Sequence, residues 1–107
     1  MEKSFSEFIK LATEEYLKQV KDYTLLYNLT KRCRQMRFYH FGYFCGKLLE
    51  PLNNYQYLDE LAICAYYIGE YQESYNLCKQ ILSICPENEK ERIIRNQSFN
   101  LKKLEEK

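Results

Sequence analysis

A chain of 107 residues has the usual length of one domain, and its 46% apolar residues supply enough apolar surface for a folded core. Sixteen basic and 15 acidic residues leave a formal net charge of +1, which excludes a global field that would attract nucleic acid or an anionic membrane. The composition therefore predicts a folded chain and excludes general disorder.

Targeting signals are not evident. The N-terminal sequence Met-Glu-Lys-Ser lacks the apolar region of a signal peptide. No uncharged stretch, 61–69 included, approaches the roughly 20 residues that a membrane-spanning helix needs. We therefore expect an intracellular, cytoplasmic protein. The abundance of Asn, Lys, Ile and Tyr with little Ala is compatible with an AT-rich genome such as that of a large virus, for which the location would be the host cytoplasm or the virion.

Five cysteines are odd in number, form no Cys-x-x-Cys pair and fall mostly among apolar residues; they are Cys33, Cys45, Cys64, Cys78 and Cys85. A zinc site would need close pairs of ligands, and His40 is the sole histidine. We expect buried, reduced thiols, with neither a metal nor a cofactor.

The first predicted helix spans residues 4–20. Ser4 followed by Glu7 forms a capping box at its start. Apolar residues then recur at helical spacing, at Phe5, Phe8, Ile9, Ala12, Tyr16 and Val20.

Two further helices are predicted within residues 22–54. Asp22 can cap the first of them, whose apolar stripe is Leu25, Leu26, Leu29, Cys33 and Met36. The second carries Phe38, Phe41, Cys45, Leu48 and Leu49. Pro51, followed by Asn53 and Asn54, ends this region.

The C-terminal half predicts three helices. One spans about 56–68, a turn follows at Gly69-Glu70, and the next spans about 71–85 before Pro86. Asn88 with Glu91 is expected to cap a last helix within 88–107, which carries Ile93, Ile94, Gln97, Leu101 and Leu104. No segment alternates as a strand does. We therefore predict a single all-α domain over 1–107, a short stack of about five to six antiparallel helices closed by a C-terminal capping helix.

Residues 55–87 resemble a tetratricopeptide repeat, which is a helix-turn-helix unit. The packing places are taken by Leu58, Leu61, Ala62 and Ala65, the turn by Gly69 and Tyr71, the small inter-helix places by Ser74 and Cys78, and the exit by Leu82 and Pro86. The resemblance implies a stack of helix pairs that presents a groove.

Residues 22–54 are interpreted as a degenerate repeat. Leu48-Leu49 before Pro51 echoes Ile81-Leu82 before Pro86. The segment departs from the pattern, because Arg34 and Met36 stand near the place of the turn glycine and Phe41 occupies the place of a small residue.

A narrower resemblance covers residues 57–99. The run 58–71, followed by Cys78, Ile81-Leu82, Arg92 to Asn96 and Phe99, is similar to the helical repeat region that follows the catalytic domain of certain bacterial and giant-virus glycosyltransferases. The chain has no room for a nucleotide-sugar-binding domain and contains no Asp-x-Asp motif. The resemblance implies an accessory or orphaned part of such an enzyme system.

In tetratricopeptide repeats the first helix of each pair lines the groove. The places that would face it here are Gln56, Asp59, Ile63, Tyr66 and Tyr67. Tyrosines can anchor a peptide or helix by burying a ring and forming one hydrogen bond. The alternative is that Tyr66 and Tyr67 pack against neighbouring helices, because two adjacent residues are not expected to face one side.

Charged side chains suggest two further sites. Lys31, Arg32, Arg34 and Arg37, next to aromatic residues, could bind phosphate or a nucleobase, or could be a solvated helix end that complements the helix dipole. Arg92, Arg95 and Asn96 share one helix face and could bind a partner's carboxylate, or an internal one such as Asp59 or Glu60.

No catalytic constellation is recognisable, since lone His40 has no evident Ser or Asp companion. We therefore predict a non-catalytic protein-protein interaction module that binds a protein or peptide, or itself as a homodimer. The alternatives are the accessory role in glycosylation and nucleic-acid binding through residues 31–37.

Overall fold

The structure, a computed structural model, describes residues 11, 13–16, 18, 19 and 21–106. Over these ranges it contains helices and no strand, which confirms the all-α class. The elements from residue 23 onward are α2 (Tyr23–Gln35), α3 (Tyr39–Leu49), the short 3-10 helix η1 (Glu50–Leu52), α4 (Tyr55–Tyr67), α5 (Tyr71–Leu82) and α6 (Glu87–Glu105). No helix among the described residues combines the length and apolar character needed to cross a bilayer.

The N-terminal helix predicted over 4–20 lies only partly within the described residues. Its capping box, Ser4 with Glu7, and the apolar residues Phe5, Phe8, Ile9, Ala12 and Val20 lie outside them. Residues 11, 13–16 and 18 are helical. Tyr16, expected on the apolar stripe, is 67% exposed.

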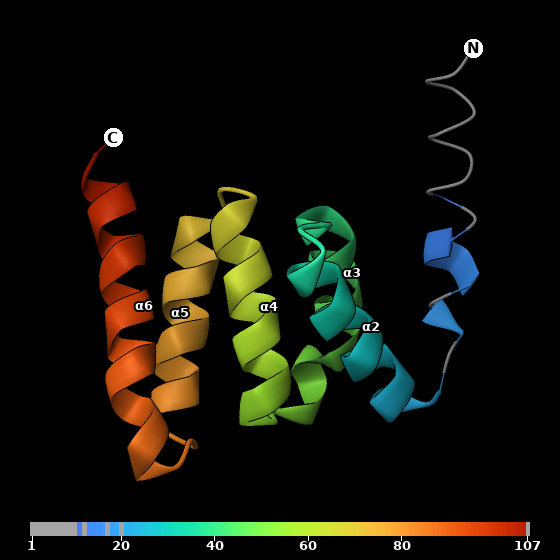
Figure 1. Ribbon diagram of the computed structural model, residues 1–107, viewed down its shortest axis with the longest axis horizontal. Coiled ribbons are helices and arrows are strands. Elements are labelled where there is room, and N and C mark those ends of the chain that lie inside the picture. The colour runs from blue at the N-terminus through green and yellow to red at the C-terminus, as the bar shows by residue number, and fades with distance from the viewer. Residues whose placement is uncertain (1–10, 12, 17, 20, 107) are drawn as a thin grey trace.

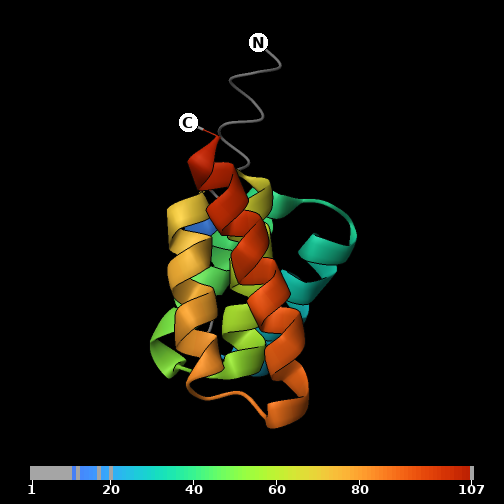
Figure 2. The ribbon, with the colours of Figure 1, turned by 90° about the vertical axis from the view of Figure 1, so that its left-hand side faces the viewer.

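The helices follow one another in chain order along the long axis of the molecule (Figure 1). The turn after α4 and the turn after α5 lie at opposite ends of these helices, so each helix of this half stands beside the next. Viewed from the α6 end, α5 lies on one side of α6, and α2 is seen on the other side of α6, farther from the viewer (Figure 2).

Helix starts recur at a constant spacing. The N-caps of α2, α4 and α6 are Asp22, Asn54 and Pro86, so the step from the first cap to the second equals the step from the second to the third. We call this step the repeat interval. Asp22 accepts a hydrogen bond from the Leu25 amide (3.2 Å), and Asn54 accepts one from the Gln56 amide (2.9 Å). These two side chains satisfy amides that have no partner within the helix.

The capping box predicted at Asn88 is wrong. The cap lies two residues earlier, at Pro86, which forms no side-chain hydrogen bond, and helix α6 begins at Glu87. Proline at this place is extended (φ −64°, ψ 156°), and its lack of an amide hydrogen costs nothing at a helix start, where amides have no helical partner. Asn88 therefore lies inside the first turn.

The turns within the two helix pairs have the same backbone conformation. Residues 36–38 join α2 to α3, and residues 68–70 join α4 to α5. The first residue of each turn has ψ near zero (4° and 6°), the third has ψ 64° in both, and the central residue has positive φ, 65° at Arg37 and 89° at Gly69. The chain therefore repeats one helix-turn-helix unit.

This repeat corrects the predicted alignment of the degenerate segment. Arg37, and not Arg34 or Met36, takes the place of the turn glycine. One repeat interval separates Gly42 from Ser74, so the small place is occupied by Gly42 and not by Phe41. The prediction matched Leu48 with Ile81, which is an error of one residue. One repeat interval before the buried Ile81 lies Leu49, which is also buried.

Two clusters form the core. One lies between α4, α5 and α6 and contains Leu58, Leu61, Ala62, Leu77, Cys78, Ile81 and Ile93. The other lies between α2 and α3 and contains Leu26, Cys45 and Leu49. Small residues draw α4 and α5 together: Ala62 and Ser74 are buried, and the Ser74 hydroxyl donates to the Ala62 carbonyl (2.8 Å).

Two glycines bring α3 against α4. A Cβ atom at Gly42 would stand 2.6 Å from Cys64 Sγ, and one at Gly46 would stand 3.3 Å from Leu61 Cα. Both distances are shorter than ordinary van der Waals contacts, so a side chain at either position would force Cys64 or Leu61 to shift.

Some predicted boundaries and stripes differ from the structure. Helix α5 ends at Leu82 and not near Cys85. Ser83 is its C-cap, and the Ser83 hydroxyl donates a hydrogen bond to the Gln80 carbonyl (2.7 Å). Several side chains assigned to apolar stripes are largely exposed, namely Leu25, Met36, Phe38, Phe41, Ile94 and Leu101. Leu25 lies in the first turn of α2, and Met36 and Phe38 lie in the turn that joins α2 to α3.

Candidate functional site

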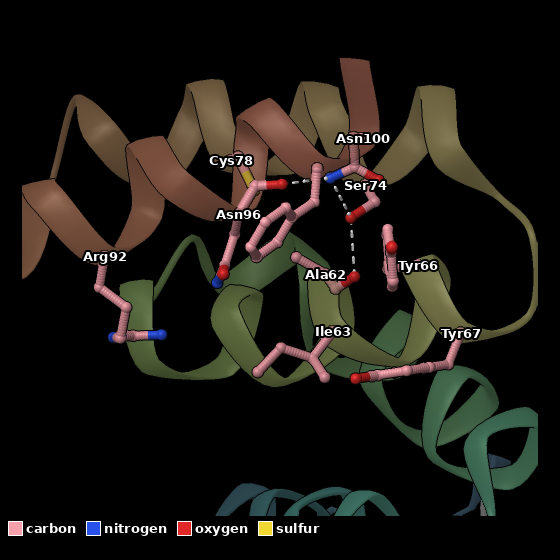
Figure 3. A pocket seen from close by; sticks show the side chains of 10 residues that line it. Ala62, Ile63, Tyr66, Tyr67, Ser74, Cys78, Arg92, Asn96 and Asn100 are labelled. Atoms are coloured by element: carbon pink, nitrogen blue, oxygen red, sulfur yellow. Dashed lines mark hydrogen bonds between the residues drawn. The ribbon is translucent and has the colours of Figure 1, made fainter. Parts of the chain in front are cut away.

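The described part of the molecule contains a cleft of about 270 Å³ that is lined by both polar and aromatic side chains (Figure 3). Helices α4, α5 and α6 form it, and its lining is Ala62, Ile63, Tyr66, Tyr67, Ser74, Cys78, Arg92, Asn96, Phe99 and Asn100. Figure 3 shows Arg92 at one end and Tyr67 at the other, with Ile63 between them. We call this hollow the α4–α6 cleft.

An ion pair closes one end of the cleft. The Arg92 guanidinium donates to both carboxylate oxygens of Asp59 (3.3 and 2.8 Å) and also to Glu89 (2.7 Å). Hydrogen bonding to Asp59 raises the pKa of Arg92, and burial raises the pKa of Asp59 against the opposing effect of Arg92. The cation of the cleft is therefore already neutralised by two carboxylates.

The inner wall of the cleft carries a buried polar chain. Asn100 Nδ2 donates to Ser74 Oγ (2.9 Å), and Ser74 Oγ donates to the Ala62 carbonyl. Asn100 is 1% exposed, and its Oδ1 accepts no hydrogen bond from the residues that the structure describes. Beside them, burial raises the pKa of the Cys78 thiol to about 12, so this sulfur is protonated at neutral pH and is a weak nucleophile.

Aromatic side chains form part of the wall of the cleft. Tyr67 is 58% exposed and Phe99 is 49% exposed, although both side chains line the cleft. Tyr67 stacks on Tyr39 of α3 with ring centroids 4.4 Å apart, and it meets Tyr66 edge to face at 5.2 Å. These contacts hold the Tyr67 ring in place while one part of it remains open to solvent.

Three of the five predicted groove residues line the cleft, namely Ile63, Tyr66 and Tyr67. Asp59 lies at its end in the ion pair with Arg92, and Gln56 is an exposed residue of the first turn of α4 that does not line it. The alternative, that the two tyrosines pack against neighbouring helices, is borne out: Tyr67 stacks on Tyr39 of α3, and Tyr66 meets Tyr71 of α5 with ring centroids 5.5 Å apart. The reason given for it does not hold, because both side chains also line the cleft. Tyr66 and Tyr67 are the last two residues of α4, and their long side chains reach the same opening from either side of an edge-to-face contact.

Sequence reasoning singled out Arg92 and Asn96 of α6 as part of a possible carboxylate-binding face, but it missed the two other residues of that helix that line the cleft, Phe99 and Asn100. The signal that would have found them is the repeat interval, because Glu87 follows Tyr55 by the same step that separates Tyr55 from Tyr23. Helix α6 thus begins one repeat interval after α4 and contributes to the same cleft.

The four basic residues within 31–37 do not form one surface. Lys31 and Arg32 are exposed in the last two turns of α2, and Arg37 is exposed in the turn that follows. Arg34 instead points to α4, where its guanidinium donates twice to Glu60, a carboxylate that is 7% exposed. Arg34 is therefore committed to an internal partner, as Arg92 is, whereas Arg95 pairs loosely with exposed Glu91 (3.8 Å).

The five cysteines are free thiols. Cys45, Cys64 and Cys78 are buried, and Cys33 and Cys85 are half-buried. Burial raises the pKa of Cys45 to about 11 and that of Cys64 to about 12. Within the described residues, no group of three or more His, Cys, Asp or Glu side chains is placed to hold a metal ion.

Comparison of the chain with protein-family models, with curated proteins and with solved structures finds no match.

Proposed function

We propose that the chain is a non-catalytic interaction module of the tetratricopeptide-repeat type, which binds a peptide or helix of a partner protein in the α4–α6 cleft. The observation that carries the proposal is the position of the cleft. It opens between the first helices of two successive repeat units and has solvent-exposed aromatic side chains on its walls. Repeat stacks of helix pairs use this concave face for binding.

The repeated geometry supports the assignment to this class. Successive units share the cap positions, the three-residue turn with a central positive φ, and buried residues at equivalent places such as Leu26 and Leu58. The step from Asp22 to Asn54 is slightly shorter than the roughly 34 residues of a tetratricopeptide repeat. The antiparallel packing of each pair follows from its short turn.

The chemistry of the cleft favours an uncharged segment with a large apolar side chain. Tyr67 and Phe99 offer partly open ring faces, and such side chains are frequent anchors at protein interfaces. Arg92 has two carboxylate partners of its own, so it offers little to an acidic ligand. Peptide recognition through an aromatic anchor is therefore expected, rather than recognition of a terminal carboxylate.

Selection of random peptides displayed against the folded chain tests this function. Enriched peptides should bind the wild-type chain, and Tyr67→Ala or Phe99→Ala should weaken them tenfold or more, since loss of an interface anchor costs at least about 1.4 kcal/mol. Asp59 is unsuitable as a test position, because its removal would leave Arg92 without its main partner.

Tyr23→Ala is the matched control. Tyr23 is a comparably exposed tyrosine (46%) at the start of α2, and it does not line the cleft. Circular dichroism must give the same helicity for all variants. If every enriched peptide binds Tyr67→Ala and Phe99→Ala as tightly as it binds Tyr23→Ala, the cleft is not the binding surface.

A further inference from the structure

The turn between α2 and α3 carries two large apolar side chains that are open to solvent. Met36 is 51% exposed and Phe38 is 53% exposed. In Figure 2 this turn projects on the side of α6 opposite to α5. We call residues 36–38 the tip. Single apolar residues are common on protein surfaces, but two of them on one projecting turn are available to a partner.

The tip is positively charged. Helices α2 and α3 and the tip between them contain no aspartate or glutamate. Two cations of these helices, Arg34 and Lys47, are paired with carboxylates of other elements. Arg32 and Arg37 are exposed and form no ion pair with a carboxylate of the described residues. Apolar side chains and unpaired cations therefore occur together at the tip.

The equivalent turn of the next unit lacks these features. One repeat interval after the tip lie residues 68–70, which are isoleucine, glycine and glutamate. The central residue has a φ of 65° at Arg37 and of 89° at Gly69. Arginine adopts this region at a cost, and such strained residues are found where a side chain has a function. The Arg37 side chain is therefore a candidate contact.

The α4–α6 cleft complements the tip. Its walls include the partly exposed rings of Tyr67 and Phe99, which can enclose an apolar side chain. At the end where Arg92 lies, the two carboxylates of Asp59 and Glu89 meet one guanidinium, so this group carries one net negative charge. An apolar anchor flanked by cations therefore matches the cleft in polarity and in charge.

The tip and the cleft adjoin on the same molecule. Tyr39, which follows the tip, stacks on Tyr67 of the cleft wall with ring centroids 4.4 Å apart. When two complementary surfaces adjoin, a two-fold axis can bring each against its counterpart on a second copy, so that the contact forms twice. We propose that a second copy of this chain occupies the cleft, with Met36 and Phe38 of each copy in the cleft of the other.

This inference rests on the proposed function and names the partner. It narrows the homodimer predicted from the sequence to one pair of surfaces. Because exposed charges contribute to the contact, added salt should weaken the association.

Sedimentation velocity at protein concentrations up to about 1 mM tests the proposal. The wild-type chain should form a dimer. The tip variant, Met36→Ala with Phe38→Ala, and the cleft variant, Phe99→Ala, should each weaken dimerisation at least about tenfold, because each removes an interface anchor. Leu25→Ala is the control, since Leu25 is 42% exposed in the first turn of α2 and does not line the cleft. Circular dichroism must give the same helicity for all variants.

Mixing the two variants tests whether the tip meets the cleft. A mixed pair retains one intact contact, between the tip of the cleft variant and the cleft of the tip variant. Neither variant retains such a contact with its own kind. The mixture should therefore form a heterodimer more tightly than either variant associates with itself.

Arg37→Gly tests the contribution of charge. Glycine suits the positive φ of this position, so the substitution should not destabilise the fold. Dimerisation should nevertheless weaken about threefold to tenfold, because a cation next to the anchors is lost. Unchanged dimerisation would overturn the role given to this side chain.

The two proposals fail in different ways. A wild-type chain that stays monomeric would overturn the self-association, and displayed peptides that depend on Tyr67 or Phe99 would still support the interaction module. A dimer that both variants leave intact would place the contact elsewhere. If the mixed variants do not associate, the tip does not enter the cleft. If neither peptides nor a second copy depend on Tyr67 or Phe99, the proposed function is overturned as well.

Discussion

Two places in the chain, where a helix pair is followed by the next helix, can be compared, and only one of them contains a cleft. At the first junction, where α4 follows the α2–α3 pair, α2 packs directly against α4. The rings of Tyr27 and Tyr57 are 5.1 Å apart, and Arg34 pairs with buried Glu60. At the second junction, where α6 follows the α4–α5 pair, a cleft of about 270 Å³ lies between α4 and α6.

We attribute the difference to two positions on the second helix of each pair. Gly42 and Gly46 occupy them at the first junction, where a Cβ atom at either would crowd Cys64 or Leu61 of α4. Their counterparts one repeat interval later are Ser74 and Cys78, which both line the cleft. Two missing side chains allow α4 to approach closely, and two present ones accompany an opening.

The largest expected effect comes from exchanging these residues. The double substitution Gly42→Ser with Gly46→Cys places the second junction's residues in the first and should destabilise the chain by about 2–4 kcal/mol through overpacking against Cys64 and Leu61. The midpoint of urea denaturation measures it. Serine and cysteine are better helix formers than glycine, so crowding alone can produce a loss. A more stable variant would refute the role given to the glycines.

Removing the Arg34 guanidinium, which pairs with Glu60 between α2 and α4, should reduce the stability of the fold somewhat less. Arg34→Met leaves the Glu60 carboxylate, 7% exposed, without its partner, and we expect a loss of about 2 kcal/mol because an uncompensated charge remains buried. The matched control is Arg95→Met, which breaks an exposed pair with Glu91 and should change stability by less than about 0.5 kcal/mol. Equal losses in the two variants would show that the Glu60 pair is not special.

The turns allow a smaller test of the repeat. Gly69 has a φ of 89°, and a Cβ atom there would have no neighbour within 4 Å. Gly69→Ala should therefore lose about 1 kcal/mol, from the backbone conformation alone. Thermal unfolding followed by circular dichroism measures the change. An unchanged melting temperature would mean that this turn tolerates a side chain without strain.

The smallest effect is expected in the opposite direction. Arg37 adopts the same turn place with a φ of 65°, a region that non-glycine residues adopt at a cost. Arg37→Gly should stabilise the chain by about 0.5 kcal/mol, because relief of strain exceeds the added chain entropy of glycine. The same denaturation measurement applies, and a loss of stability would show that the Arg37 side chain contributes more than the turn conformation costs.

Much of the local structure was predictable from the sequence. Asp22 as a cap, the stop around Pro51, the Gly69 turn and the small residues Ala62 and Ser74 are signals that act within a few residues or within one helix pair. The all-α class follows from them. The errors lie where a local pattern admits two solutions, as at Asn88, where a side-chain cap was expected but Pro86 starts the helix.

The site was predictable only in part. Ile63, Tyr66 and Tyr67 were expected from the position of α4 in its repeat, and they line the cleft. Phe99 and Asn100 were not, because an exposed phenylalanine and a buried asparagine reverse the usual relation between polarity and burial. A stripe assigned by polarity alone therefore favoured Ile94 and Leu101, which are exposed.

The sequence by itself determined the helices, the Asp22 cap and the turn at Gly69, since these depend on backbone preferences and on spacing along the chain. Tertiary structure alone decided the pairing of Arg34 with Glu60 and the cleft itself, and it settled the alternatives left open for Arg92 by pairing it with Asp59, an internal partner that the sequence had suggested. Each of these depends on how closely two helices approach, and that distance is set by the side chains of several helices together.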